Sequence, residues 1–278
     1  MRTTRSIAFN NTREDGFTLT ELLVVIVTVA ILALLLLPAL AGTKPNSQAF
    51  QCLENLRQLT LGWQMYAEDN NSKLAPNGGQ ANSGPPPTDP SYRSGGANFQ
   101  WCPGTMNAFS LFATNYVQAG CIYPYVKTMN VYKCPADQSF FKFGLNIYPK
   151  VRSYSMNCYL SPILHNEWTS VGTRNFYKDT DITRPGPSMT YVLIDENEYS
   201  INDAFFVSDP TMVNWWQDVP APRHGNAGGL SFADGHSEMR RWTDKYVLKS
   251  PLIAHGFPSD PSCGDNAWLE ARSTVLIQ

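Results

Sequence analysis

The segment RHGNAGGLSFADGH, at 223–236, holds the side chains whose types and spacing are best suited to chemistry. His224 is followed by nine residues and then by Asp234 and Gly235, and His236 comes directly after them. Imidazole and carboxylate groups can exchange protons as an acid–base pair, or they can bind a metal ion. His224, Asp234 and His236 are therefore one candidate metal site. Oxygen ligands would suit calcium, and added histidine nitrogens would suit zinc.

A structural role explains the same motif, and we prefer it. Asp234 and Gly235 form a strong turn pair, because glycine tolerates positive φ and aspartate hydrogen-bonds to its own backbone. His224 would then satisfy backbone groups where a strand begins. In the metal alternative, Asp195 and Glu196 would be further ligands. The sequence contains no nucleophile elbow, phosphate loop or H-E-x-x-H motif. It therefore predicts no enzyme, no catalytic residue and no bound cofactor, with calcium or zinc as the alternative.

An aromatic pair, Trp215 and Trp216, lies in a predicted loop between Pro210 and Pro220. Exposed aromatic pairs can stack on sugars or contact protein partners. A pair under a long loop more often covers the edge of a core. Both interpretations stay open, and the pair is a candidate binding site only in the first.

The Gly16–Phe17 peptide bond is a candidate cleavage site, that is, a substrate for a peptidase. A short leader with Arg2, Arg5 and Arg13 precedes it, Glu21 follows, and an apolar run extends over 22–41. A secretory signal peptide is cut after its apolar region. Here the small residue comes before the apolar region, so cleavage after Gly16 would leave that region in the mature protein.

The sequence GFTLTE with its apolar tract resembles the type III signal of type IV pilins and pseudopilins. In that family a membrane peptidase cuts after the glycine and methylates the new N-terminus. The resemblance implies processing at Gly16 and Phe17, and pairing of Glu21 with the Phe17 ammonium of a neighbouring subunit. The alternative is an uncleaved single-pass anchor. Such an anchor would have no partner for the carboxylate of Glu21, which is costly beside an apolar stretch.

The apolar run is long enough to be a membrane span. About 20 apolar residues cross a hydrocarbon core, and they must be helical there. Positive charge precedes the run and the next basic residue is Lys44, which predicts a cytoplasmic N-terminus and an exported C-terminal domain. We therefore expect a leader at 1–16, a transmembrane helix at 17–41 and a protein of the bacterial inner membrane.

A second resemblance covers much of the remaining chain. The spacing from His224 to Asp234 and Gly235 resembles the H-x9-D-G domain found at the C-terminal end of many pilin-like bacterial proteins. Three further segments look like pieces of that family: NLRQLTLGWQMYAEDN at 55–70, KCPAD at 133–137 and RSYSMN at 152–157. The resemblance implies an association with prepilin processing but no particular reaction.

Composition narrows the classes of partner. The chain has 278 residues and a net charge of −2, which gives no support to a nucleic-acid partner, because such a partner requires a basic face. Six cysteines occur without a C-x2-C pair, which argues against a zinc ribbon. In an exported domain they can form disulfides, but the sequence does not choose among the 15 pairings.

The spacing of apolar residues predicts the elements that position these groups. An amphipathic continuation of the first helix is expected over 42–72, because apolar residues recur there every three or four positions; they are Cys52, Leu56, Leu59, Trp63 and Tyr66. Next come a loop at 76–98, a second helix near 107–127, a strand or turn at 131–137, strands at 152–160 and 188–196, and a hairpin at 229–242. The predicted fold is α+β: a long N-terminal helix, membrane-spanning in its first half, packed on an antiparallel sheet in a globular domain at 73–278, as in pilins.

The sequence thus predicts a structural subunit of a type IV pilus-like or type II secretion pseudopilus filament. Its expected partners are the prepilin peptidase, other pilin-like subunits, the inner-membrane assembly machinery and the membrane. The alternative is an anchored, exported module that binds glycans or other polymers through Trp215, Trp216 and the 76–98 loop.

Overall fold

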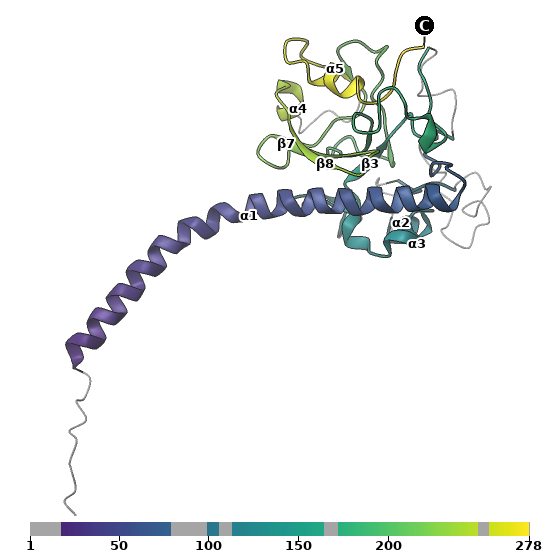
Figure 1. The fold of residues 1–278 in the computed structure, drawn as a ribbon. Helices are drawn as coiled ribbons and strands as arrows, with labels where there is room; N and C mark the ends of the chain where they lie inside the picture. The colour runs from purple at the N-terminus through teal and green to yellow at the C-terminus, as the bar shows by residue number, and fades with distance from the viewer. Residues whose placement is uncertain (1–17, 79–98, 106–112, 164–171, 250–255, 278) are drawn as a thin grey trace, which may run out of the picture. The chain divides into compact units, whose positions relative to one another are not determined.

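The computed structural model describes residues 18–78, 99–105, 113–163, 172–249 and 256–277, except for the side chains of residues 33–46, 113 and 143. The chain divides into two compact units, Met1–Lys44 and Pro45–Gln278. The first helix, α1 (Leu19–Asp69), has residues in both units. All other helices and strands described below belong to the second unit (Figure 1).

The C-terminal part of α1 has one buried face, as its apolar periodicity predicts. Cys52, Leu56, Leu59 and Trp63 are at most 1% exposed, and they form part of the core. The helix ends where the sequence predicts, because Asn71 and Ser72 adopt left-handed backbone conformations with φ of 56° and 66°. The backbone N–H of Ser72 then donates to the carbonyl of Ala67 and closes the last turn.

A five-stranded sheet forms the centre of the second unit. It comprises β3 (Tyr154–Asn157), β4 (Tyr191–Asp195), β5 (Phe205–Phe206), β7 (Ala227–Phe232) and β8 (Ser237–Arg241). The strand order is β5-β3-β4-β7-β8. All neighbouring pairs are antiparallel except β3 and β5, which are parallel. The predicted hairpin is confirmed as β7 and β8, and the two predicted strands are confirmed as β3 and β4.

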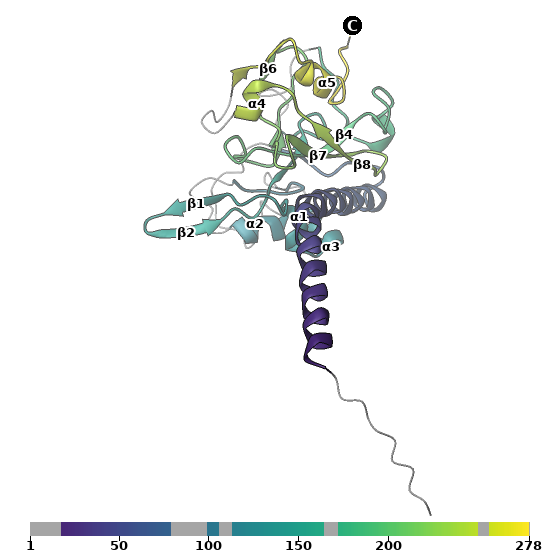
Figure 2. The ribbon, with the colours of Figure 1, turned by 90° about the vertical axis from the view of Figure 1, so that its left-hand side faces the viewer.

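Smaller elements surround this sheet. A separate hairpin of β1 (Phe140–Phe143) and β2 (Asn146–Pro149) projects from the second unit (Figure 2). Strand β6 (Trp215–Trp216) pairs with β9 (Phe257–Pro258). The short helices are α2 (Ala113–Ala119), α3 (Tyr123–Val126), α4 (Lys245–Lys249) and α5 (Asp265–Glu270), with 3-10 turns at Met129–Tyr132 and Asp179–Asp181. The single helix predicted near 107–127 is therefore two short helices within its described part. The 131–137 segment forms turns, and most of the 76–98 loop lies outside the described residues.

The sheet has a core on each face. Leu193 of β4 packs in a cluster with the buried face of α1, whereas its neighbour Ile194 belongs to a second cluster with Val247 of α4 and Leu269 of α5. Figure 1 shows residues 45–69 of α1 on one side of the sheet and α4 and α5 on the other. Strand β4 is buried along its whole length, as an apolar strand between two layers must be.

The predicted fold class is wrong. The fold is mixed α/β, and its central sheet is not antiparallel throughout: Met156 of β3 pairs with Phe205 of β5 in parallel. Strand β4 occupies one edge of β3 and ends opposite Tyr154, where β3 begins. The next segment, 196–204, leads to the other edge of β3 near this same end, so β5 runs in the direction of β3. The membrane-spanning half of the helix is also not found: within the described residues, no helix is sufficiently long and apolar to span a membrane. The span was predicted at 17–41. Residue 17 and the side chains of 33–41 are not among the parts of the chain that the structure describes.

Candidate functional site

His224 sits at a sharp turn before β7. Gly225 and Asn226 follow it in left-handed conformations, with φ of 65° and 67°, and the His224 N–H donates to the carbonyl of Ala227 at 2.9 Å. This tight reversal turns the half-buried imidazole toward the body of the domain. Its Nε2 lies 3.1 Å from the Sγ of Cys134.

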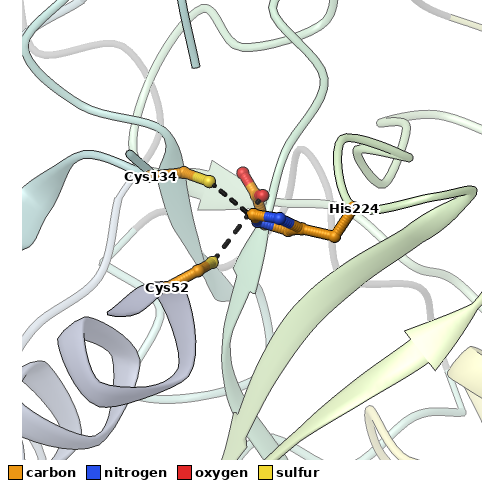
Figure 3. Close-up of side chains that lie close together, drawn as sticks. Cys52, Cys134 and His224 are labelled. Atoms are coloured by element: carbon orange, nitrogen blue, oxygen red, sulfur yellow. Dashed lines mark hydrogen bonds between the residues drawn. The ribbon is translucent and has the colours of Figure 1, made fainter. Parts of the chain in front are cut away.

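Two cysteines and one aspartate meet at this imidazole. Cys52 comes from α1, Cys134 from the turn after Tyr132, and Asp195 from the end of β4. One ligand atom from each of these residues and from His224 lies within 4.8 Å of the other three. The Sγ of Cys52 is 4.0 Å from Oδ2 of Asp195. Figure 3 shows the two thiols and the imidazole converging from three different segments. We call these four residues the Cys-Asp-His cluster.

A shell of hydrogen bonds orients the cluster. The guanidinium of Arg223 donates to Oδ1 of Asp195, to the carbonyl of Glu196 at 2.8 Å and to Oε2 of Glu198 at 3.0 Å. The hydroxyl of Tyr154 donates to the Sγ of Cys52 at 3.3 Å. Asp195 is therefore held by one oxygen, while its other oxygen faces Cys52.

The surroundings favour the thiol form of Cys134 and the neutral form of His224. The hydrogen bond with Cys52, burial and the charge of Asp195 raise the pKa of the Cys134 thiol. Burial and the positive charge of Arg223 lower the pKa of His224. Burial raises the pKa of Asp195 to about 7, although Arg223 acts in the opposite direction. A reactive cysteine needs a lowered thiol pKa. The Cys134–His224 contact therefore lacks the electrostatics of an activated nucleophile, but it has donor atoms suited to a metal ion.

The structure does not bring the predicted metal set together. Asp234 and His236 lie at the β7–β8 turn, at the opposite end of β7 from His224, and six strand residues span about 20 Å. Oδ1 of Asp234 is hydrogen-bonded to the backbone N–H and to Nδ1 of His236, at 3.1 and 2.6 Å. The His236 ring stacks on Phe232, and Gly235 has φ of 95°. These contacts agree with the structural interpretation, in which Asp234 and Gly235 form the hairpin turn.

The tryptophan pair does not form one exposed platform. Trp216 is 1% exposed, and its Nε1 donates to Asp244 at 2.9 Å. Trp215 is 39% exposed, and its backbone carbonyl accepts a hydrogen bond from Asn266. Only one of the two rings is thus available to a ligand, because side chains alternate between the faces of a strand.

The predicted processing site lies largely outside the described residues. Gly16 and Phe17 are not described. Glu21 is exposed in the first turn of α1, where its carboxylate accepts hydrogen bonds from the N–H and the hydroxyl of Thr18 at 2.9 and 2.7 Å. The start of its own helix therefore orients this carboxylate.

The sequence alone does not indicate Cys52 and Cys134 as members of this cluster. Cys52 fitted the apolar stripe of a helix, and Cys134 stood in the KCPAD segment, without the close spacing that marks a zinc ribbon. The sequence suggests Asp195 only as a further ligand of the predicted set. All six cysteines are free thiols in the structure, which contains no disulfide among them. Comparisons with protein-family models, with curated proteins and with solved structures found no match.

Proposed function

We propose that this protein is a subunit of a type IV pilus-like or type II secretion pseudopilus-like filament. It is made as a prepilin, cleaved after Gly16 by a prepilin peptidase and assembled through its N-terminal helix. The observation that carries this proposal is the start of α1. The helix begins at Leu19, just after the Gly16–Phe17 bond, and has Glu21 as the acidic residue of its first turn.

The described N-terminal part of α1 supports an assembly role, because its surface is apolar and uncovered. The large apolar side chains from Leu19 to Leu32 are each 47–81% exposed. A contiguous apolar surface of this kind marks an interaction site. The same helix in neighbouring subunits would cover it, as apolar helices cover one another in bundles. Glu21, exposed beside this surface, would then meet the N-terminal ammonium of an adjacent subunit.

The alternative, an exported glycan- or polymer-binding module, has less support. Its best candidate residues were Trp215 and Trp216, and the second ring is buried against Asp244. A stacking platform normally offers aromatic faces to the ligand. A single half-exposed indole is weak evidence for such a site, whereas the apolar helix surface requires a covering partner.

Mass spectrometry of the N-terminal peptide tests the proposal. The protein is produced in a bacterium that has a prepilin peptidase, and the expected mature peptide begins with N-methylated Phe17. In Gly16→Leu the bulky side chain should obstruct the peptidase, so full-length precursor accumulates. Gly16→Ala is the matched control and should still be processed. Normal leader removal in Gly16→Leu, or a mature N-terminus elsewhere, would contradict the proposal.

A further inference from the structure

We propose that Cys52, Cys134, Asp195 and His224 bind one zinc ion, which joins α1 to the central sheet. This inference concerns the second unit and goes beyond the proposed filament role. It rests on four donor groups that come from distant parts of the sequence and converge on one point (Figure 3).

The separations of the donor atoms fit a tetrahedral site. Zinc–ligand bonds of about 2.0–2.3 Å place neighbouring donors of a tetrahedron about 3.3–3.8 Å apart. The Cys134 Sγ–His224 Nε2 and Cys52 Sγ–Asp195 Oδ2 distances are 3.1 and 4.0 Å, and all four donor atoms lie within 4.8 Å of one another. Small side-chain rotations would bring them to equal distances from a central ion.

The donor types select zinc among the common metals. Two sulfurs, one imidazole nitrogen and one carboxylate oxygen are the atoms that tetrahedral zinc accepts. Calcium and magnesium require oxygen ligands, so the cysteines argue against them. Copper(I) prefers soft thiolate and thioether ligands, which argues against a set containing a carboxylate.

The surrounding residues form hydrogen bonds that orient the proposed ligands. Arg223 holds Oδ1 of Asp195 and leaves Oδ2 on the side of the two thiols. Tyr154 donates to Cys52. Such outer contacts orient metal ligands, and their loss commonly weakens metal binding about 10–100-fold. The positive charge of Arg223 also offsets the net negative charge that two thiolates and a carboxylate would leave around a divalent ion.

A route for the ion reaches one edge of the cluster. Cys134 lines an open cavity of about 500 Å³, whose other lining residues include Asn55, Lys133 and Asp137. With four protein ligands the site has no open coordination position, so its role is structural. By binding α1, the turn at Cys134, β4 and the residue before β7, one ion would fasten the helix to the sheet in the folded state only.

Metal analysis of the full-length protein, purified in detergent without chelators, is the first test. We expect one zinc ion per chain and a lower melting temperature after chelation, because an ion that binds only the folded state stabilises it. Replacement by cobalt should produce thiolate-to-cobalt charge-transfer absorption and the visible bands of tetrahedral cobalt. This measurement uses the wild-type chain and so does not depend on the folding of any variant. Zinc-free protein that neither binds added zinc nor shows these bands would overturn the proposal.

Matched substitutions locate the site. Cys52→Ser, Cys134→Ser and His224→Ala should each weaken zinc binding at least tenfold. Cys263→Ser and His236→Ala, which alter a thiol and an imidazole outside the cluster, should retain one zinc ion per chain. Equal zinc content in Cys134→Ser and Cys263→Ser would overturn the assignment. So would a Cys52–Cys134 disulfide in the protein as isolated, detected as a cross-linked peptide lighter by two hydrogens, because it would consume both thiol ligands.

Discussion

Single side chains in one short motif have separate roles. Asp234 and His236 stabilise a tight turn through mutual hydrogen bonds, while His224 at the other end of the strand contacts Cys134. Arg223, the residue before His224, holds Asp195. The residues of the motif that contact other titratable groups are therefore at its start, Arg223 and His224. Its end, Asp234 to His236, forms a hairpin turn. A stability effect at Asp234 would say nothing about metal binding at His224.

Glu21 offers a test of assembly at the scale of one residue. Glu21→Ala should be processed normally but should enter filaments poorly, because the Phe17 ammonium of a neighbouring subunit would be left without its counter-charge. An unpaired charge in an apolar contact costs about 3–5 kcal/mol. The measurement is the ratio of mutant to wild-type subunits in sheared filaments after co-expression. Thr28→Ala, on the same helix but without a charge, is the control, and equal incorporation of Glu21→Ala would count against the filament proposal.

The packing of the second unit requires neighbouring segments to lie very close to the backbone of β7. This strand lies between β4 and β8 and carries Gly228 and Gly229 in succession. A Cβ at Gly229 would lie 2.6 Å from Leu56 of α1, and one at Gly228 would collide with the backbone oxygen of Ala221. The two glycines therefore allow neighbouring segments to approach the strand from both sides.

Gly228→Ala tests this packing. The added methyl group meets a backbone oxygen, which cannot move as a side chain can, so we expect a loss of about 1–3 kcal/mol in the free energy of unfolding. Gly186→Ala is the matched control, because nothing lies within 4 Å of the position its Cβ would take. Chemical denaturation of both variants gives the comparison. A Gly228→Ala variant as stable as Gly186→Ala would show that the strand can shift to accommodate the methyl group.

For the whole molecule, buried acids make stability depend on pH. Glu270 of α5 is 8% exposed, and burial, followed by the negative charge of Asp209, raises its pKa from 4.5 to about 7. A hydrogen bond with the side chain of Asn266 acts in the opposite direction and lowers this pKa. The folded state thus keeps a proton that the unfolded chain releases at lower pH, so the contribution of this group to stability falls as pH rises from about 4.5 to 7.

Glu270→Gln should remove this dependence. We expect the variant to be more stable than wild type by about 1–3 kcal/mol at pH 8, after allowance for solvent screening, and the difference should shrink toward pH 4.5. Melting temperatures across this range, with metal content held constant, provide the measurement. Glu68→Gln, at an exposed position of α1, serves as the control for a changed net charge. Parallel pH profiles for wild type and Glu270→Gln would refute the expected protonation.

Local features were predictable from the sequence because neighbouring residues decide them. The spacing of Cys52, Leu56, Leu59 and Trp63 defines one face of a helix whatever that face packs against. Asp234 and Gly235 specify a hairpin turn through their own backbone preferences. The helix end at Asp69 follows in the same way from the residues after it.

Long-range pairing was decided only by the tertiary structure. The parallel pairing of β3 with β5 depends on which sheet edge remains free after β4 has paired, and no local pattern records this. The same holds for the Cys-Asp-His cluster. Cys52 reads as part of an apolar helix face, and only the packing of α1 on the sheet brings its sulfur to Asp195. His224 was recognisable as a chemical group, but its partners are set by the register of β4 and β7 and by the turn that carries Cys134, because contacts between distant segments depend on the whole fold.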